Sequence, residues 1–434
     1  MVSPKGKQDN VQKQTENKQA TAQSCSYQNI QAYQTGINSS LKTKEVLQKY
    51  HDVASKLEPE SRVALSKLLK SGVLLNDKSN DGSSVLDNLH KIVTEPRIKG
   101  LNSARIAGEA ITAISNPRII TQHFGDIPEN ISKAVLQHPE LGVRAQKDMD
   151  IGGNSSSCVA ASIEFNLAQK NPAEFVRMAA GLSSENFSVT KEIPLSAIAN
   201  TKESAVWLLD KFNLPYALGE NNSAKVKIQP DRNAIIRARV QTSYKDPGER
   251  SVVDVLMQSA LMNTGSQNTY NSLTDTRENT LFNPQNNKGL SMFEMNFMES
   301  VVSGKSKQVT MYHNLDETGK IVSQSCDAET MEKQIAATLE AGENVIIGIV
   351  ETNAQGQIVN GHEMTITNIY SNQNGDTVFA CNDTADDSDE PYYVLAKNII
   401  PQINHALINK EAVGNMDVPK TEDWIEFYKQ YITA

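Results

Sequence analysis

The sequence predicts a mixed α+β protein, because helical and strand patterns occupy different parts of the chain. Between about residues 41 and 341, apolar residues repeatedly recur three or four positions apart, which is typical of amphipathic helices. Residues 344–395 instead contain four short strand-like runs, and Gly-containing turns separate the first three. Residues 1–40 are rich in Gln, Lys, Asn, Ser and Thr and hold few large apolar residues, which predicts disorder.

Composition and charge restrict the classes of function. The chain has 434 residues, a formal net charge of -9 and a hydrophobic content of 38%, which suits a globular protein of two or three domains. No basic stripe is present, so no nucleic-acid partner is expected. No apolar run approaches the ~20 residues that span a bilayer, so no membrane association is expected. No apolar secretory core follows the first residues, which predicts a cytoplasmic protein or one exported by a non-classical route.

Residues 41–140 are predicted to form a small helical domain. Apolar residues recur at helical spacing from Val46 to Leu69, and a second stripe runs from Ile106 to Ile114. His138-Pro139 then breaks the pattern, and a Gly- and Ser-rich loop follows it. Residues 141–434 are therefore predicted to form a separate domain.

The second domain begins with helices and ends with strands. Residues 158–171 predict a helix, since Val159, Ile163 and Leu167 fall four positions apart. Further helices are expected at 173–180, 202–212, 252–262 and 328–341, and a long polar loop at 263–290. Strands are expected at 344–350, 362–370, 377–382 and 392–395, with short glycine turns joining the first three into an antiparallel sheet.

Cys158 is the candidate nucleophile among the four cysteines Cys25, Cys158, Cys326 and Cys381. It lies where a Gly/Asn/Ser loop meets the start of an apolar helix. Unpaired amide N–H groups and the positive end of the helix dipole favour a thiolate there, and the thiolate is the reactive form. The other three are expected to be ordinary thiols, because the four cysteines form no Cys-x-x-Cys pair and no zinc spacing.

A candidate base and its partner lie in the predicted sheet. His362 follows Gly361 and opens a strand, and a histidine in that place can face a helix terminus across a cleft. The strand at 377–382 ends in Asn382-Asp383, and either side chain could accept a hydrogen bond from the imidazole and hold its orientation. The alternative reading is a structural histidine and an ordinary Asn-Asp turn.

The order of these elements resembles the papain-like cysteine peptidase superfamily. The resemblance is carried by the helix-initial Cys158, by the strand from Gly361 to Thr367 and by Cys381-Asn382-Asp383. It implies a helical lobe that holds the nucleophile and an antiparallel sheet lobe that holds the His362 base. It also implies a third member, for which Asn382 is preferred over Asp383 because it closes the strand. Calpains and exported bacterial enzymes match equally well.

The resemblance further implies a Gln shortly before the nucleophile, where it would donate to the oxyanion. Gly152 stands at that position, so Gln146 and Asn154 are the candidate replacements, beside the backbone N–H of Cys158. No cofactor and no metal site is expected. The histidines are scattered, and the acidic run from Asp383 to Glu390 lacks the glycine and register of a calcium loop.

Two classes of function follow. The first is a thiol-dependent hydrolase, a cysteine peptidase that acts on a protein or peptide substrate through an acyl-enzyme. The same triad would also serve a transglutaminase or a deamidase. The second is an inactive papain-like domain that binds other proteins. Residues 41–140 could block the cleft as in a zymogen or pack elsewhere as a support or docking domain, and the lack of a secretory signal favours the latter.

Overall fold

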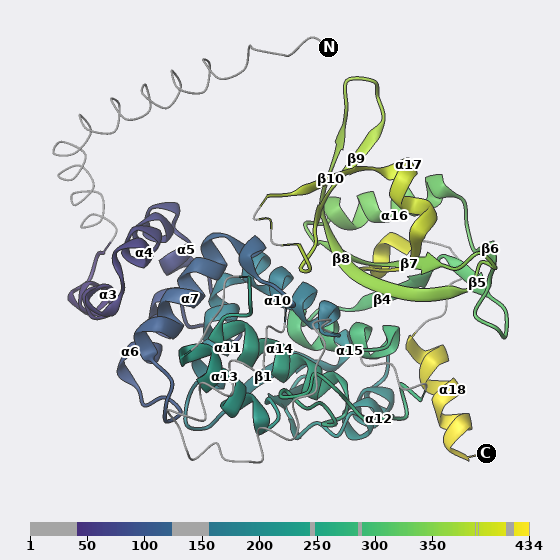
Figure 1. Cartoon of the computed structure of the whole chain (residues 1–434). Helices are drawn as coiled ribbons and strands as arrows, with labels where there is room; N and C mark the ends of the chain where they lie inside the picture. The colour runs from purple at the N-terminus through teal and green to yellow at the C-terminus, as the bar shows by residue number, and fades with distance from the viewer. Residues whose placement is uncertain are drawn as a thin grey trace, which may run out of the picture.

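The computed structural model describes residues 41–123, 156–243, 248–284, 289–386, 388, 390–413 and 421–433. The fold within these ranges is mixed α+β, as predicted, and has two parts (Figure 1). A helical lobe contains the described residues between 41 and 303 and the C-terminal helix, and a sheet lobe contains the described residues between 307 and 413. The predicted disorder of residues 1–40 lies outside the described ranges.

The chain enters the helical lobe through short helices with clear boundary signals. Thr43 caps the first by accepting from the N–H of Val46, and Gly72 ends the second in the left-handed region at φ 84°. Ser84 and Asp87 form a reciprocal capping box. The elements are α3 (Lys44–Lys56), α4 (Pro59–Ser71), α5 (Val73–Asn76), α6 (Val85–Thr94), α7 (Ser103–Ser115) and η1 (Pro117–Ile119).

The rest of the helical lobe is built around α14, whose residues are all buried. Ser251 and Asp254 fix its start with a second capping box. The helices are α10 (Cys158–Lys170), α11 (Pro172–Leu182), α12 (Lys202–Lys211), α13 (Asn233–Ser243), α14 (Val252–Gly265), α15 (Met292–Ser303) and α18 (Thr421–Thr433). A small antiparallel sheet, which the sequence did not predict, consists of β1 (Val189–Pro194), β2 (Tyr216–Leu218) and β3 (Ser223–Ile228) in the order β1-β3-β2.

The sheet lobe contains a six-stranded antiparallel sheet in the order β10-β9-β8-β7-β11-β4. Gly356 and Gly375, at φ 81° and 82°, allow the tight turns on either side of β8. The strands are β4 (Lys307–Met311), β7 (Val345–Thr352), β8 (Ile358–Ser371), β9 (Thr377–Asn382), β10 (Tyr392–Leu395) and β11 (Ile403–Asn409). Accompanying them are α16 (Ala328–Glu340), α17 (Ala396–Ile399), η4 (Ile400–Gln402), η5 (Lys410–Val413) and the hairpin β5 (His313–Leu315) and β6 (Ile321–Gln324).

Two hydrophobic clusters hold the molecule together. One lies between the sheet and α16, where Ile335 meets Ile347 and Phe379. The other runs from α3–α7 through α10, α11 and α14 to the facing side of the sheet at Ile346 and Leu407. The described residues of the predicted N-terminal domain therefore share a core with the helix that carries Cys158.

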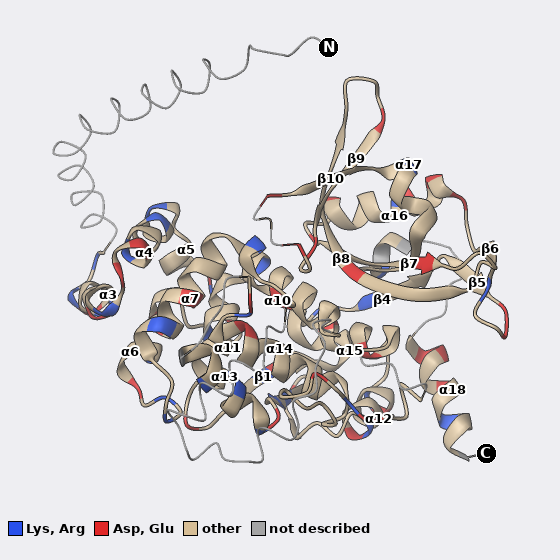
Figure 2. Ribbon diagram, in the orientation of Figure 1, with Lys and Arg blue, Asp and Glu red and all other residues tan. Residues whose placement is uncertain are grey.

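Within the described ranges, no helix has both the length and the apolar content needed to cross a membrane. In Figure 2, the positions of basic and acidic residues are interspersed along the ribbon of both lobes, in keeping with the mixed charge of the sequence.

Candidate active site

Cys158 is the first residue of α10, as predicted. Its thiol is partly buried, and the preceding Ser157 does not cap the helix with its side chain. The Ser157 hydroxyl is instead turned inward, where it donates to Oε1 of Gln258 at 3.1 Å. The first-turn N–H groups of α10 are thus not occupied by a side-chain cap, and they leave a positive electrostatic environment at the thiol.

His362 and Asp383 meet at the thiol from the sheet lobe. His362 lies on β8 opposite Ile349, and its Nε2 is 2.6 Å from Oδ1 of Asp383. Burial alone would lower the pKa of His362, but hydrogen bonds to Asp383 and Cys158 outweigh it and raise the pKa to about 10. Burial would likewise raise the pKa of Asp383, yet the bond to His362 holds it below its ordinary value. Asp383 and Cys158 thus both act on the imidazole of His362, and together they favour the imidazolium.

The preference for Asn382 as the partner of His362 is wrong. Asn382 is the last residue of β9 and is 3% exposed, and its Oδ1 accepts from Nη1 of Arg118 at 3.3 Å. Successive residues of a strand point to opposite sides, so the strand end and the residue after it cannot both face the imidazole. Asp383, which is free of the strand ladder, also accepts from the N–H of Ala385 at 2.9 Å, and this bond fixes its carboxylate.

Gln146 and Asn154, the predicted oxyanion donors, lie outside the described residues. A glutamine that the sequence did not single out does lie beside the site. The N–H of Gln122 donates to the carbonyl of Thr384 at 2.9 Å, and its Oε1 accepts from the Thr384 hydroxyl at 2.9 Å. His123 continues the contact, with its Nε2 2.9 Å from the carbonyl of Ala385. Residues 120–123 thus run along the turn that carries Asp383.

Two buried polar side chains connect residues 120–123 to the nucleophile: Gln258 of α14, and Arg250 just before α14. Gln258 is fully buried, and its Nε2 donates to the carbonyl of Thr121 and to Oε2 of Glu164, both at 2.9 Å. Arg250 donates from Nη2 to the carbonyl of Gln122 at 3.0 Å and to the hydroxyl of Ser157. Because the Arg250 side chain bonds to both Ser157 and Gln122, it fixes the position of Gln122 relative to Cys158, the residue after Ser157.

The other cysteines lack this environment. Cys381 is buried in the sheet, and burial raises the pKa of its thiol to about 12. Burial also raises the pKa of the Cys326 thiol. Both are unpaired, and Cys25 lies outside the described residues. Among the residues that the structure covers, no group of three or more His, Cys, Asp or Glu side chains could hold a metal ion.

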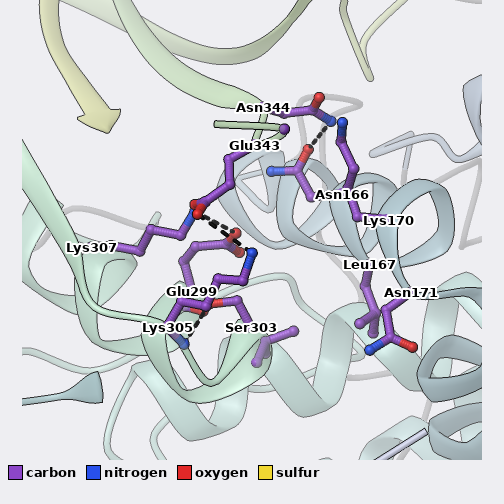
Figure 3. A pocket seen from close by; sticks show the side chains of 12 residues that line it. Asn166, Leu167, Lys170, Asn171, Glu299, Ser303, Lys305, Lys307, Glu343 and Asn344 are labelled. Atoms are coloured by element: carbon purple, nitrogen blue, oxygen red, sulfur yellow. Dashed lines mark hydrogen bonds and ion pairs between the residues drawn. The ribbon is translucent and has the colours of Figure 1, made fainter. Parts of the chain in front are cut away.

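A cavity of about 130 Å³ lies at the opposite end of α10, where the two lobes meet (Figure 3). Lys307 pairs with Glu343 there, and Glu299 approaches Lys307 at 3.9 Å. Burial raises the pKa of Glu299 to about 7. Lys170, the last residue of α10, also lines the cavity, so a helix of about 18 Å separates it from Cys158. This cavity is not part of the candidate active site.

Comparison of the chain with protein-family models, with curated proteins and with solved structures finds no match.

Proposed function

We propose that this chain is a papain-like thiol hydrolase, a cysteine peptidase with Cys158, His362 and Asp383 as its triad. The observation that carries the proposal is the cluster of Cys158, His362 and Asp383 at the start of α10. In this cluster Nε2 of His362 is 2.6 Å from Asp383, and Cys158 acts on the same imidazole. A nucleophile, a base within reach and a third group that orients the base are the recurring parts of covalent acyl transfer. The division into a helical lobe and an antiparallel sheet lobe is in keeping with the same family.

The first half of the reaction uses the thiol proton. Since Nε2 of His362 is bonded to Asp383, Nδ1 is the nitrogen left to exchange a proton with Cys158. The Cys158 sulfur attacks the substrate carbonyl carbon, and the imidazolium gives its proton to the leaving amine as the C–N bond breaks. Asp383 keeps the imidazolium oriented through both transfers. The product of this half is an acyl-enzyme thioester.

The second half returns the enzyme to its starting state. A water molecule gives a proton to His362 and attacks the thioester carbon, the carboxylic acid leaves, and the sulfur recovers its proton. In both halves the carbonyl oxygen carries negative charge and needs donors. The backbone N–H of Cys158 is one donor. Gln122 is the proposed second donor. Its side-chain oxygen Oε1 accepts from Thr384, and its side-chain nitrogen Nε2 is a donor at the same turn.

The test is covalent labelling of the purified protein with an epoxide or chloromethyl-ketone probe, read by peptide mass spectrometry. We expect Cys158 to react much faster than Cys326, which is also partly exposed and serves as an internal reference. His362→Ala should remove most of this advantage, and a fluorogenic peptide should be hydrolysed by the wild type and not by Cys158→Ala. Equal labelling of the two cysteines would instead indicate a papain-like domain that acts only by binding.

A further inference from the structure

The sheet continues beyond the catalytic residues as an open, partly aromatic face. Tyr393 of β10 pairs with Ala380 of β9, which pairs in turn with Asn368 of β8. Residues paired directly across strands share a face of the sheet. Two positions along each strand, Leu395, Val378 and Tyr370 are paired in the same way, so they lie on the same face of the sheet.

The two tyrosines of this face are well exposed, at 47% for Tyr370 and 58% for Tyr393. Their ring centroids are 6.3 Å apart with the rings tilted by 54°, so they lean toward each other over β9. Asn368 donates from Nδ2 to the Tyr370 hydroxyl at 2.9 Å and orients that ring. Two aromatic faces held at this separation form a suitable environment for a cationic side chain.

β10 is also the last strand of the sheet. One of its edges pairs with β9, and across the described ranges no strand pairs with the other. An unpaired edge offers backbone N–H and C=O groups to an extended chain. The turn before β10 begins at Asp383 and carries the exposed carboxylates of Asp386 and Glu390. The guanidinium of Arg118 interacts with Glu390 and with both tyrosines, so the two carboxylates outnumber one positive charge at the approach to this edge.

We propose that the open edge of β10 receives an extended segment of the substrate protein as an added strand, with a lysine or arginine side chain of that segment lodged against Tyr370 and Tyr393. The inference rests on the proposed function, because the turn that leads into β10 also supplies Asp383 to His362. It names the substrate class: a polypeptide with an extended, basic segment outside the scissile bond. The aromatic pair recognises the cation, the edge binds the backbone, and the carboxylates attract the segment.

Binding can be measured apart from catalysis in the Cys158→Ala protein. The probe is a fluorescein-labelled peptide of alternating lysine and valine, followed by fluorescence anisotropy at low salt. Tyr393→Ser and Tyr370→Ser should each weaken binding by about fivefold, while Tyr393→Phe, which keeps the ring face, should not. Tyr431→Ser is the matched control, because Tyr431 is 60% exposed on the distant helix α18 and should leave binding unchanged.

Two altered peptides test the proposal further. A peptide with glutamate in place of lysine should bind at least tenfold more weakly, since it meets the same carboxylates with opposite charge. N-methylation of alternate peptide bonds should abolish binding, because it removes strand pairing. Unchanged affinity in either case, or self-association of the chain through β10 in place of peptide binding, would overturn the inference. Active wild-type enzyme with no peptide affinity at β10 would refute this inference alone, and a lack of peptidase activity would refute the proposed function.

Discussion

At the scale of single residues, the site rests on which side chain His362 contacts. Asp383 makes that contact, and Asn382 turns away to Arg118. The sequence could place the two candidates at the end of a strand, but it could not show which side of the strand faces the imidazole. A one-residue change in where β9 leaves the ladder would exchange them.

Asp383→Asn should reduce kcat/KM by roughly 10²-fold. The variant should also lose activity at a lower alkaline pH than the wild type does. The pKa of His362 is raised to about 10, above its ordinary 6.5, so the imidazolium persists through neutral pH and is lost as pH rises through about 10. Removing the carboxylate lowers that pKa and moves the alkaline limb of the kcat/KM profile to lower pH. Asn382→Ala is the control and should keep the wild-type limb. An unchanged limb in Asp383→Asn would show that the carboxylate does not hold the imidazolium.

Gln122→Ala should lower kcat by about 10²- to 10³-fold with little change in KM, as expected for a donor that acts mainly on the transition state. Gln355→Ala, in an exposed turn, should have no effect. If instead KM rises while kcat is unchanged, Gln122 contributes to ground-state binding and another group holds the oxyanion. No sequence pattern pointed to Gln122, because it precedes Cys158 by 158 − 122 = 36 positions and only the folded chain brings it to the site.

At the scale of elements, local patterns predicted those that are bounded by strong signals. The helix from Cys158 and the helix ending before Gly342 were found within a residue or two, as were the strands β7, β9 and β10. β11 was missed because its buried run contains Asn404 and His405 and shows no alternation. Its place between β7 and β4 is fixed by partners far away in the sequence, and periodicity does not report such partners.

The contact between α15 and β4 predicts how stability depends on pH. The buried Glu299 has a pKa of about 7, above its ordinary 4.5, so the folded protein holds a proton that the unfolded chain releases. Stability from this group is therefore present below about pH 4.5 and is lost as pH rises to about 7. Glu299→Gln should remove this loss and stabilise the protein at pH 8, by at most about 3 kcal/mol.

Chemical denaturation at pH 5 and pH 8 measures the effect of Glu299→Gln. Glu329→Gln on α16 is the control, because that carboxylate is exposed in its pair with Lys333 and should change stability little. A Glu299→Gln protein that is less stable than the wild type at pH 8 would show that the ionised Glu299 stabilises the contact between the lobes.

At the scale of the whole molecule, the N-terminal helices pack into the lobe that carries Cys158. Leu65, Leu89 and Ile111 are fully buried in the cluster that reaches α10, and Arg118 donates to the carbonyl of Cys381 at 3.0 Å. This arrangement favours the support role for the described part of residues 41–140 over the role of an inhibitory segment. The sequence could not settle this choice, because helical periodicity shows that a face is buried and not what buries it.

A version of the protein that begins near His138 should therefore be less stable and less active than the full chain. It loses several buried apolar side chains, each of which stabilises the fold by roughly 1.5–3 kcal/mol, and it loses Gln122. A version that begins at Leu41 is the control and should behave as the full chain does. Thermal unfolding and peptide hydrolysis measure both versions. A large gain in activity from the shorter version would show that the region is an inhibitor.

The hydrogen bond between Gln122 and Thr384 joins residues 262 positions apart, and His362 follows Cys158 by 362 − 158 = 204 positions. On a ribosome, the thiol therefore emerges long before the base that would activate it, and the donors to the oxyanion cannot be assembled until β9 is complete. Under the proposed function, a nascent or partly unfolded chain carries the nucleophile without its base. The order of the sequence itself would then keep the proposed peptidase inactive during synthesis, until both lobes have folded.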